Sequence, residues 1–109
     1  MVNSEFMDSA FKAGYPYVLE IEVKVAGEVD YVCYKSYKDC VHAWRDASRL
    51  LGQAFNAYEY DEHAMAFAQI WRVSDGLLFK KHDLICTIGA FDKGSARNVV
   101  RDGEVWRIR

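Results

Sequence analysis

The stretch Ser36–Gly52, SYKDCVHAWRDASRLLG, decides the fold prediction because it combines a helix start, a helix stop and one apolar side. Ser36 is the expected N-cap, with Asp39 at the capping-box spacing, and Gly52 is expected to end the helix in a left-handed conformation. We therefore predict an amphipathic helix over residues 36–51. Its buried face repeats at steps of three and four, with Trp44 as the central anchor: Tyr37, Cys40, Val41, Trp44, Ala47, Ser48 and Leu51.

An alternating pattern before this helix predicts a strand over residues 17–25, with one buried and one wet face. The expected buried side carries Tyr17, Leu19, Ile21, Val23 and Val25, and the expected wet side carries Glu20, Glu22 and Lys24. Ala26-Gly27-Glu28 then predicts a tight turn into a partner strand, Val29–Lys35.

Two registers of this hairpin remain open. A two-residue turn at Gly27-Glu28 places Val32 and Tyr34 on the buried side of the hairpin. A three-residue turn instead places a different set there, because a slip of one residue reverses every side chain. That set is Val29, Tyr31 and Cys33.

The segment after the helix predicts further strands. We expect Gln53–Tyr60 to be irregular or a short strand, and Gln69–Val73 to be a strand that turns at Ser74-Asp75-Gly76 into Leu77–Lys81. Residues 61–73 hold an unresolved alternative, because His63–Ala68 fits a helix and a strand equally well. A second helix near residues 61–68 therefore remains open.

The C-terminal part predicts a strand at Leu84–Phe91, a polar loop at Asp92–Ala96 and a final hairpin. That hairpin consists of Val99-Val100 and Glu104–Arg109 around an Arg101-Asp102-Gly103 turn. The predicted order is strand, strand, helix and then a series of strands. We infer an α+β fold, a mostly antiparallel sheet with the principal helix on one face.

Length and composition predict a single domain over residues 7–109, since the chain has 109 residues and 51% of them are hydrophobic. Residues 1–6, MVNSEF, precede a second methionine and resemble a cloning-vector remnant, which we expect to have no structural role. Three cysteines fit no disulfide framework and indicate reduced thiols in a cytoplasmic protein. No apolar run approaches the length of a membrane span.

No residue pattern predicts catalysis, a cofactor or a metal site. Cys40 and His42 are two residues apart, so on a helix their side chains point about 200° apart and cannot share one ion. An acidic cluster is better explained as a solvated turn or as the start of a helix, where acids favour the positive end of the dipole, and His82 as part of an exposed turn. The cluster is Glu59, Asp61, Glu62 and His63. We favour a non-catalytic domain over an enzyme.

The surplus of aromatic residues suggests binding. Tyrosine, tryptophan and arginine are enriched at protein interfaces, and the candidate residues for a partner or ligand are Tyr31, Tyr34, Trp71, Arg101 and Trp106. Our leading hypothesis is a small adaptor or inhibitor, from a mobile genetic element, that binds a protein partner or a second copy through the aromatic sheet face opposite the helix.

Two alternatives belong to other classes of function. The first is a small-molecule site or minor enzyme with a pocket between helix and sheet, lined by Tyr31, Trp44 and Phe67. The second is nucleic-acid binding through a basic C-terminal segment, which the net charge of −2 disfavours. Its residues are Arg97, Arg101, Trp106, Arg107 and Arg109.

Overall fold

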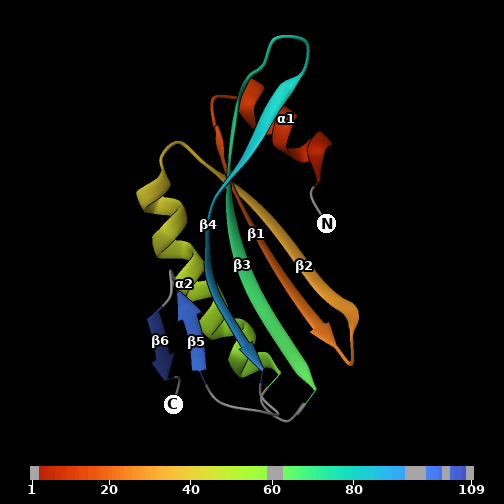
Figure 1. The fold of residues 1–109 in the computed structure, drawn as a ribbon, viewed down its shortest axis with the longest axis vertical. Helices are drawn as coiled ribbons and strands as arrows, with labels where there is room; N and C mark the ends of the chain where they lie inside the picture. The colour runs from red at the N-terminus through yellow and green to blue at the C-terminus, as the bar shows by residue number, and fades with distance from the viewer. Residues whose placement is uncertain (1–2, 59–62, 93–97, 102–103, 108–109) are drawn as a thin grey trace.

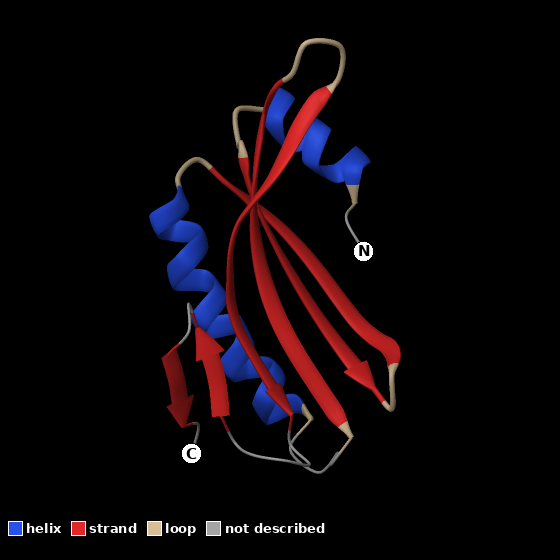
Figure 2. Cartoon of the chain, viewed as in Figure 1, coloured by secondary structure: helices blue, strands red, loops and turns tan. Residues whose placement is uncertain are grey.

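The computed structural model describes residues 3–58, 63–92, 98–101 and 104–107. Within these ranges it describes the burial of side chains up to Thr87, except for Phe55. Strands β1 to β4 form one antiparallel sheet in the order β2-β1-β3-β4, and β5 pairs with β6 separately (Figure 1, Figure 2). This confirms the predicted α+β class. The elements are α1 Ser4–Lys12, β1 Tyr17–Val25, β2 Glu28–Tyr37, α2 Cys40–Ala57, β3 Ala64–Asp75, β4 Lys80–Asp92, β5 Asn98–Arg101 and β6 Glu104–Arg107.

Helix α2 covers one face of the sheet and closes an apolar core. The buried residues are mostly small on the helix and branched on the strands, so the helix approaches the sheet closely. They are Leu19, Ile21, Val23, Ala43, Ala47, Leu51, Ala54, Ala66, Ala68 and Ile70. A hydrogen bond from the Tyr37 hydroxyl to Asp46, 2.7 Å long, ties α2 to the end of β2. Burial raises the pKa of Tyr37, and this bond lowers the pKa of Asp46.

The predicted ends of the helix are both wrong. The N-cap is Asp39, whose carboxylate accepts the His42 backbone N–H at 2.9 Å, while Ser36 lies in β2. The helix does not stop at Gly52 but continues to Ala57. Glycine inside a helix costs about 1 kcal/mol, and burial of Ala54 on the core offsets this cost.

The buried face of α2 is only partly the predicted one: Ala47 and Leu51 are buried as expected, whereas Ala43 and Ala54 take the place of Val41 and Ser48. Ala43 and Ala47 are fully buried, whereas Val41 is 58% exposed and Ser48 is exposed. Trp44 is half-buried and packs at the margin of the core. It is therefore not the central anchor, because alanines rather than the bulky indole permit the close approach of helix and sheet.

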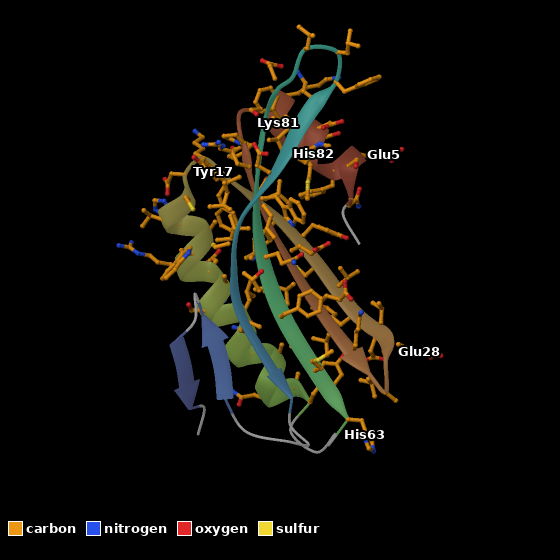
Figure 3. The ribbon with its side chains drawn as sticks, in the orientation of Figure 1. Glu5, Tyr17, Glu28, His63, Lys81 and His82 are labelled. Atoms are coloured by element: carbon orange, nitrogen blue, oxygen red, sulfur yellow. The ribbon has the colours of Figure 1, made fainter. Side chains whose placement is uncertain are left out.

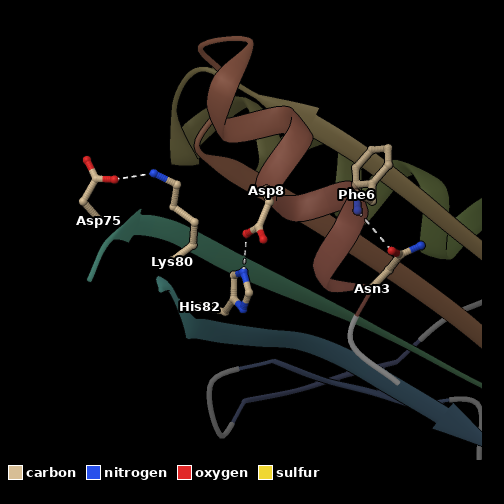
Figure 4. Close-up of polar contacts among 6 residues, drawn as sticks. All are labelled: Asn3, Phe6, Asp8, Asp75, Lys80 and His82. Atoms are coloured by element: carbon tan, nitrogen blue, oxygen red, sulfur yellow. Dashed lines mark hydrogen bonds and ion pairs between the residues drawn. The ribbon is translucent and has the colours of Figure 1, made fainter. Parts of the chain in front are cut away.

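Helix α1 covers part of the other face of the sheet. Its Met7 is fully buried and packs with Val18 of β1 and Val73 of β3. Asn3 caps this helix by accepting the Phe6 backbone N–H at 3.1 Å (Figure 4). The centre of the Phe6 ring lies 5.6 Å from the centre of the Tyr34 ring. The expectation that residues 1–6 have no structural role is therefore wrong for Asn3 and Phe6. The origin of residues 1–6 in a cloning vector stays a prediction.

The second helix near residues 61–68 is not formed where the structure describes this segment. Strand β3 begins at Ala64, so the strand alternative holds for residues 64–73, while residues 61 and 62 lie outside the described part. The irregular segment predicted at Gln53–Tyr60 is also wrong up to Ala57, because these residues extend α2. The N-terminal α1, rather than residues 64–68, covers part of the other face of the sheet.

The β1–β2 hairpin combines features of both predicted registers. Its turn is Ala26-Gly27, with φ values of 52° and 84°, which matches the left-handed turns that favour the twist of a hairpin. A register shift at Val23/Lys24 then pairs Val23 with Tyr31 and skips Asp30. As a result Tyr31 and Cys33 face α2, while Val29, Val32 and Tyr34 face the α1 side.

The β3–β4 hairpin ends in a four-residue loop, Gly76–Phe79, between paired Asp75 and Lys80. A Cβ at Gly76 would lie 2.1 Å from the Phe79 carbonyl oxygen, so only glycine fits this loop. The strand predicted at Leu77–Lys81 therefore begins only at Lys80. The final hairpin is confirmed as β5 and β6, with Ile108 outside the described residues.

Candidate functional site

A cavity of about 430 Å³ lies between the C-terminal half of α2 and the β1–β2 hairpin. It exists because α2 packs mainly on the central strands β1 and β3, which leaves the inner face of the edge strand β2 uncovered. We call this cavity the α2–β2 pocket. Its lining is largely apolar and consists of Ile21, Tyr31, Cys33, Leu50, Gln53, Ala54, Ala57 and Tyr58.

Few polar groups reach this pocket. The Tyr58 hydroxyl donates a hydrogen bond to the Asp30 carboxylate, which fixes the ring at the C-terminal end of α2. The neighbouring Cys33 raises the pKa of Tyr31 above its ordinary value of 10.0. A tyrosine hydroxyl is neutral at physiological pH even without such a shift. The amide of Gln53 is the third polar group. The arrangement suits an apolar body with one hydrogen-bonding substituent.

Most of these lining residues were missed by the sequence prediction, because the helix was expected to end at Gly52. The signal that could have found them is the spacing of Leu50, Gln53, Ala54, Ala57 and Tyr58, which continues the helical steps of three and four. Asp30 was missed because it is itself the residue that the register shift in β2 leaves unpaired, and the sequence does not reveal this shift.

The predicted binding residues do not form one surface. Tyr31 lines the α2–β2 pocket, whereas Tyr34 lies on the opposite face of β2 and packs against Phe6. Trp71 is half-buried on that same opposite face, against the cluster under α1. Arg101 belongs to β5 and Trp106 belongs to β6. The structure describes the backbone of these two residues but not their side chains.

Of the three residues predicted to line a pocket between helix and sheet, the structure places one at the α2–β2 pocket. Tyr31 is part of it, but Trp44 borders a shallower hollow near the N-terminal end of α2, together with Cys40, Val41 and Arg45. Phe67 pairs with Glu22 and therefore lies on the α1 side of the sheet. The cavity is formed nearer the C-terminal end of the helix than we predicted.

The α1 side of the sheet contains two buried carboxylates where a wet face was predicted. Glu20 is 1% exposed and Glu22 is 4% exposed. Lys24 lies 3.5 Å from Glu22. The Glu20 oxygens and the buried Trp71 Nε1 lack a partner in good hydrogen-bond geometry among the described residues, although the Tyr34 hydroxyl interacts with the Glu20 carboxylate. Burial and the nearby Glu20 carboxylate raise the pKa of Tyr34 to about 12.

The remaining candidates are structural contacts. The His42 ring pairs with Asp39 at 2.7 Å, and burial raises the pKa of the Cys40 thiol. His82 is half-buried in β4 rather than in an exposed turn, and its Nε2 lies 2.7 Å from Asp8 of α1 (Figure 4). Within the described residues, no three His, Cys, Asp or Glu side chains gather to hold a metal ion. His63 is exposed, and the predicted acids at 59, 61 and 62 lie outside those residues.

A second surface was not expected from the sequence. The residues Leu77, Leu78 and Phe79 of the β3–β4 loop are 100%, 83% and 82% exposed, and we call them the hairpin tip. The sequence signal was three consecutive large apolar residues without alternation, directly after Asp-Gly. Lys81 and His82 lie near this end of the molecule, while Glu28 and His63 lie at the other end (Figure 3).

No protein-family model, curated protein or solved structure matches the chain. In the described part of the chain, no helix combines the length and the apolar character needed to cross a membrane.

Proposed function

We propose that this chain is a binding domain that receives an apolar group in the α2–β2 pocket. The observation that carries the proposal is the cavity of about 430 Å³, which lies within the ~300–1,000 Å³ range of ligand sites. Its position on the inner face of an edge strand keeps it open to solvent on one side. This moves the pocket hypothesis ahead of the sheet-face hypothesis, because α1 already covers part of the second face.

The chemistry of the pocket narrows the ligand class. The apolar lining favours an aliphatic or aromatic body, and the neutral Tyr31 hydroxyl offers one hydrogen bond. The exposed acids Glu28 and Asp30 near this end of the hairpin disfavour an anionic head group. We expect neutral or cationic ligands to bind more tightly than anionic ligands of the same apolar body.

Nile red, a neutral apolar dye, tests the proposal. We expect saturable binding to the wild type, detected as a blue-shifted increase in fluorescence. Ala57→Trp should weaken this binding at least tenfold, because Ala57 lines the pocket and the indole would fill it. Ser48→Trp is the matched control, since Ser48 is an exposed residue of the same helix outside the pocket. Equal binding by both variants, or none by the folded wild type, would overturn the proposal.

The sheet-face hypothesis remains a second candidate because apolar residues on the α1 side stay accessible. Val32 is 43% exposed, Met65 is 39% exposed and Leu84 is 47% exposed. Such residues support a protein partner on the part of the face that α1 leaves open. Val32→Asp combined with Met65→Asp should then abolish capture of that protein partner.

Nucleic-acid binding through Arg101 and Trp106 stays a separate prediction.

The cytoplasmic location is also a proposal. It is supported by three free cysteines, Cys33, Cys40 and Cys86, all half-buried and none in a disulfide. Titration with Ellman's reagent on protein purified without reductant should find three thiols per chain. Fewer than three would favour an oxidising compartment.

A further inference from the structure

We propose that the apolar group received by the α2–β2 pocket is the hairpin tip of a second copy of this chain. The inference rests on the proposed function of the pocket and goes beyond it by naming the occupant. The same chain carries an exposed apolar projection and an open apolar cavity.

The hairpin tip is a projection held in a fixed shape. Gly76 packs under the Phe79 carbonyl, and Lys80 forms an ion pair with Asp75 across the base of the loop (Figure 4). The Lys80 ammonium also lies 4.8 Å from the centre of the Phe11 ring of α1. Ordering the loop before contact lowers the entropy cost of docking. Leaving its three apolar side chains in water is unfavourable in proportion to their area.

The tip and the pocket lie toward opposite ends of the molecule. The tip follows the end of β3 at Asp75, whereas the pocket includes Tyr31, which pairs with Val23 near the other end of β1. The longest dimension of the chain is 44 Å. Two copies placed antiparallel can therefore exchange both contacts at once, each tip entering the other copy's pocket, and such a pair closes by twofold symmetry.

The buried area favours the closed pair over an open chain. The three tip side chains expose roughly 450 Å², on the scale of the area that large apolar side chains bury. The receiving pocket contributes a smaller area than the tip, so one contact alone lies well below the range of stable interfaces. Two exchanged contacts double the area that a pair of molecules buries, which favours the closed pair over a single contact.

The charges near the two contact regions have opposite signs. The tip is followed by Lys80 and Lys81; Lys80 already pairs with Asp75, and the Lys81 side chain is 66% exposed with Asp83 at 3.9 Å. The β2 side of the pocket carries the exposed acids Glu28 and Asp30. Docking therefore brings an exposed lysine toward exposed carboxylates, so association should weaken as salt increases.

Sedimentation velocity over 5–500 µM tests the pairing. We expect the wild-type mass to rise with concentration from 12.6 kDa toward twice that value. Leu78→Asp combined with Phe79→Asp should leave a monomer throughout, and so should Ala57→Trp. Val41→Asp is the control for loss of an exposed apolar residue, because Val41 is 58% exposed and belongs to neither contact. It should associate like the wild type.

A mixture of the two defective variants gives the decisive comparison. The tip variant retains an open pocket and the Ala57→Trp variant retains an intact tip. Their equimolar mixture should form a 1:1 complex through one contact, weaker than the wild-type pair, although each variant alone is monomeric. A mixture that stays monomeric while the wild type dimerises, or tip variants that dimerise normally, would overturn the proposal.

The outcome also separates this inference from the proposed function. A wild type that stays monomeric at 500 µM but binds Nile red in an Ala57-dependent manner would overturn the pairing and leave the pocket proposal intact. Tip-dependent binding to neutral phosphatidylcholine vesicles by such a monomer would assign the tip to a lipid surface instead. Absence of Nile red binding to the tip variant, whose pocket is vacant, would overturn both proposals.

Discussion

The two faces of the four-stranded sheet show how differently one set of strands can be covered. The α2 face is closed by an 18-residue helix that contributes alanines, and its buried side chains are apolar. The α1 face is covered by a nine-residue helix and contains two buried glutamates and the buried Trp71 Nε1. The first face is well packed near Ala43 and Ala47 and opens into a pocket only beside β2.

This difference indicates that the two faces of the sheet contribute differently to stability and to binding. An apolar face with a tightly packed centre supplies stability, and its open edge is available for binding. The α1 face carries an energetic cost, because a buried carboxylate without a partner is unfavourable. We therefore expect substitutions on the two faces to change stability by different amounts and, at one position, in the opposite direction.

The largest expected effect lies on the α2 face. Ile70→Ala removes a fully buried side chain from the core and should lower the free energy of unfolding by about 2–5 kcal/mol. The measurement is the urea midpoint at constant m-value. Met65→Ala is the contrasting variant on the same strand, since Met65 is 39% exposed, and it should cost less than about 1 kcal/mol. Equal losses would contradict the assignment of the main core to the α2 face.

An intermediate effect is expected for α1. Asn3→Ala combined with Phe6→Ala removes the helix cap and the contact with Tyr34, and should cost about 2 kcal/mol. This corresponds to a decrease of several degrees in melting temperature for a chain of this size. Ser4→Ala, at an exposed position, is the control. An unchanged melting temperature would show that α1 does not stabilise the second face.

A smaller effect of opposite sign is expected at Glu20. Glu20→Met replaces a buried carboxylate, which has only the Tyr34 hydroxyl beside it and no partner in good hydrogen-bond geometry among the described residues, by an apolar side chain of similar length, and should raise stability by about 1 kcal/mol. Glu22→Met should not, because that carboxylate lies 3.5 Å from Lys24. Thermal unfolding at pH 7 compares the two variants. Destabilisation by Glu20→Met would mean that the carboxylate has a partner that stabilises the fold.

The smallest effect concerns the start of α2 and depends on pH. The His42 backbone N–H, followed by its side chain, lowers the pKa of Asp39 below its ordinary value of 3.8. The ionised cap therefore stabilises the fold above pH 3.8, and this contribution is lost as the pH falls through the lowered pKa. Asp39→Asn should be less stable than the wild type at pH 6, and the difference should shrink below pH 3.8. A constant difference from pH 6 to pH 2.5 would contradict this assignment.

The sequence predicted the elements whose pattern is local. The alternation of Tyr17–Val25 and the helical repeat through Leu51 are set by the period of the backbone, and both elements are confirmed. The end of α2 was mispredicted because burial of Ala54 outweighs the helix penalty of Gly52, which is a tertiary effect. Helix α1 was missed because residues 1–6 were set aside as a vector remnant.

The site was less predictable than the fold. Tyr31 faces the pocket because β2 skips Asp30 at the register shift, and no local pattern reveals such a shift. The pocket itself depends on how far α2 extends over the edge strand, which is decided by packing. The exposure of Leu77 and Phe79 reverses the usual preference of apolar residues for the interior, so composition alone misplaces them.

The most direct test of the α2–β2 pocket is the alkylation rate of Cys33, which lines it. In a variant with Cys40→Ala and Cys86→Ala, N-ethylmaleimide should modify Cys33 several-fold more slowly when the pocket is saturated with Nile red. A matched variant that retains only Cys86, outside the pocket, should react at the same rate with and without the dye. Protection of Cys33 alone is the result that we predict. An unchanged Cys33 rate at saturating dye would place the bound dye elsewhere and contradict the assignment of the pocket as the binding site.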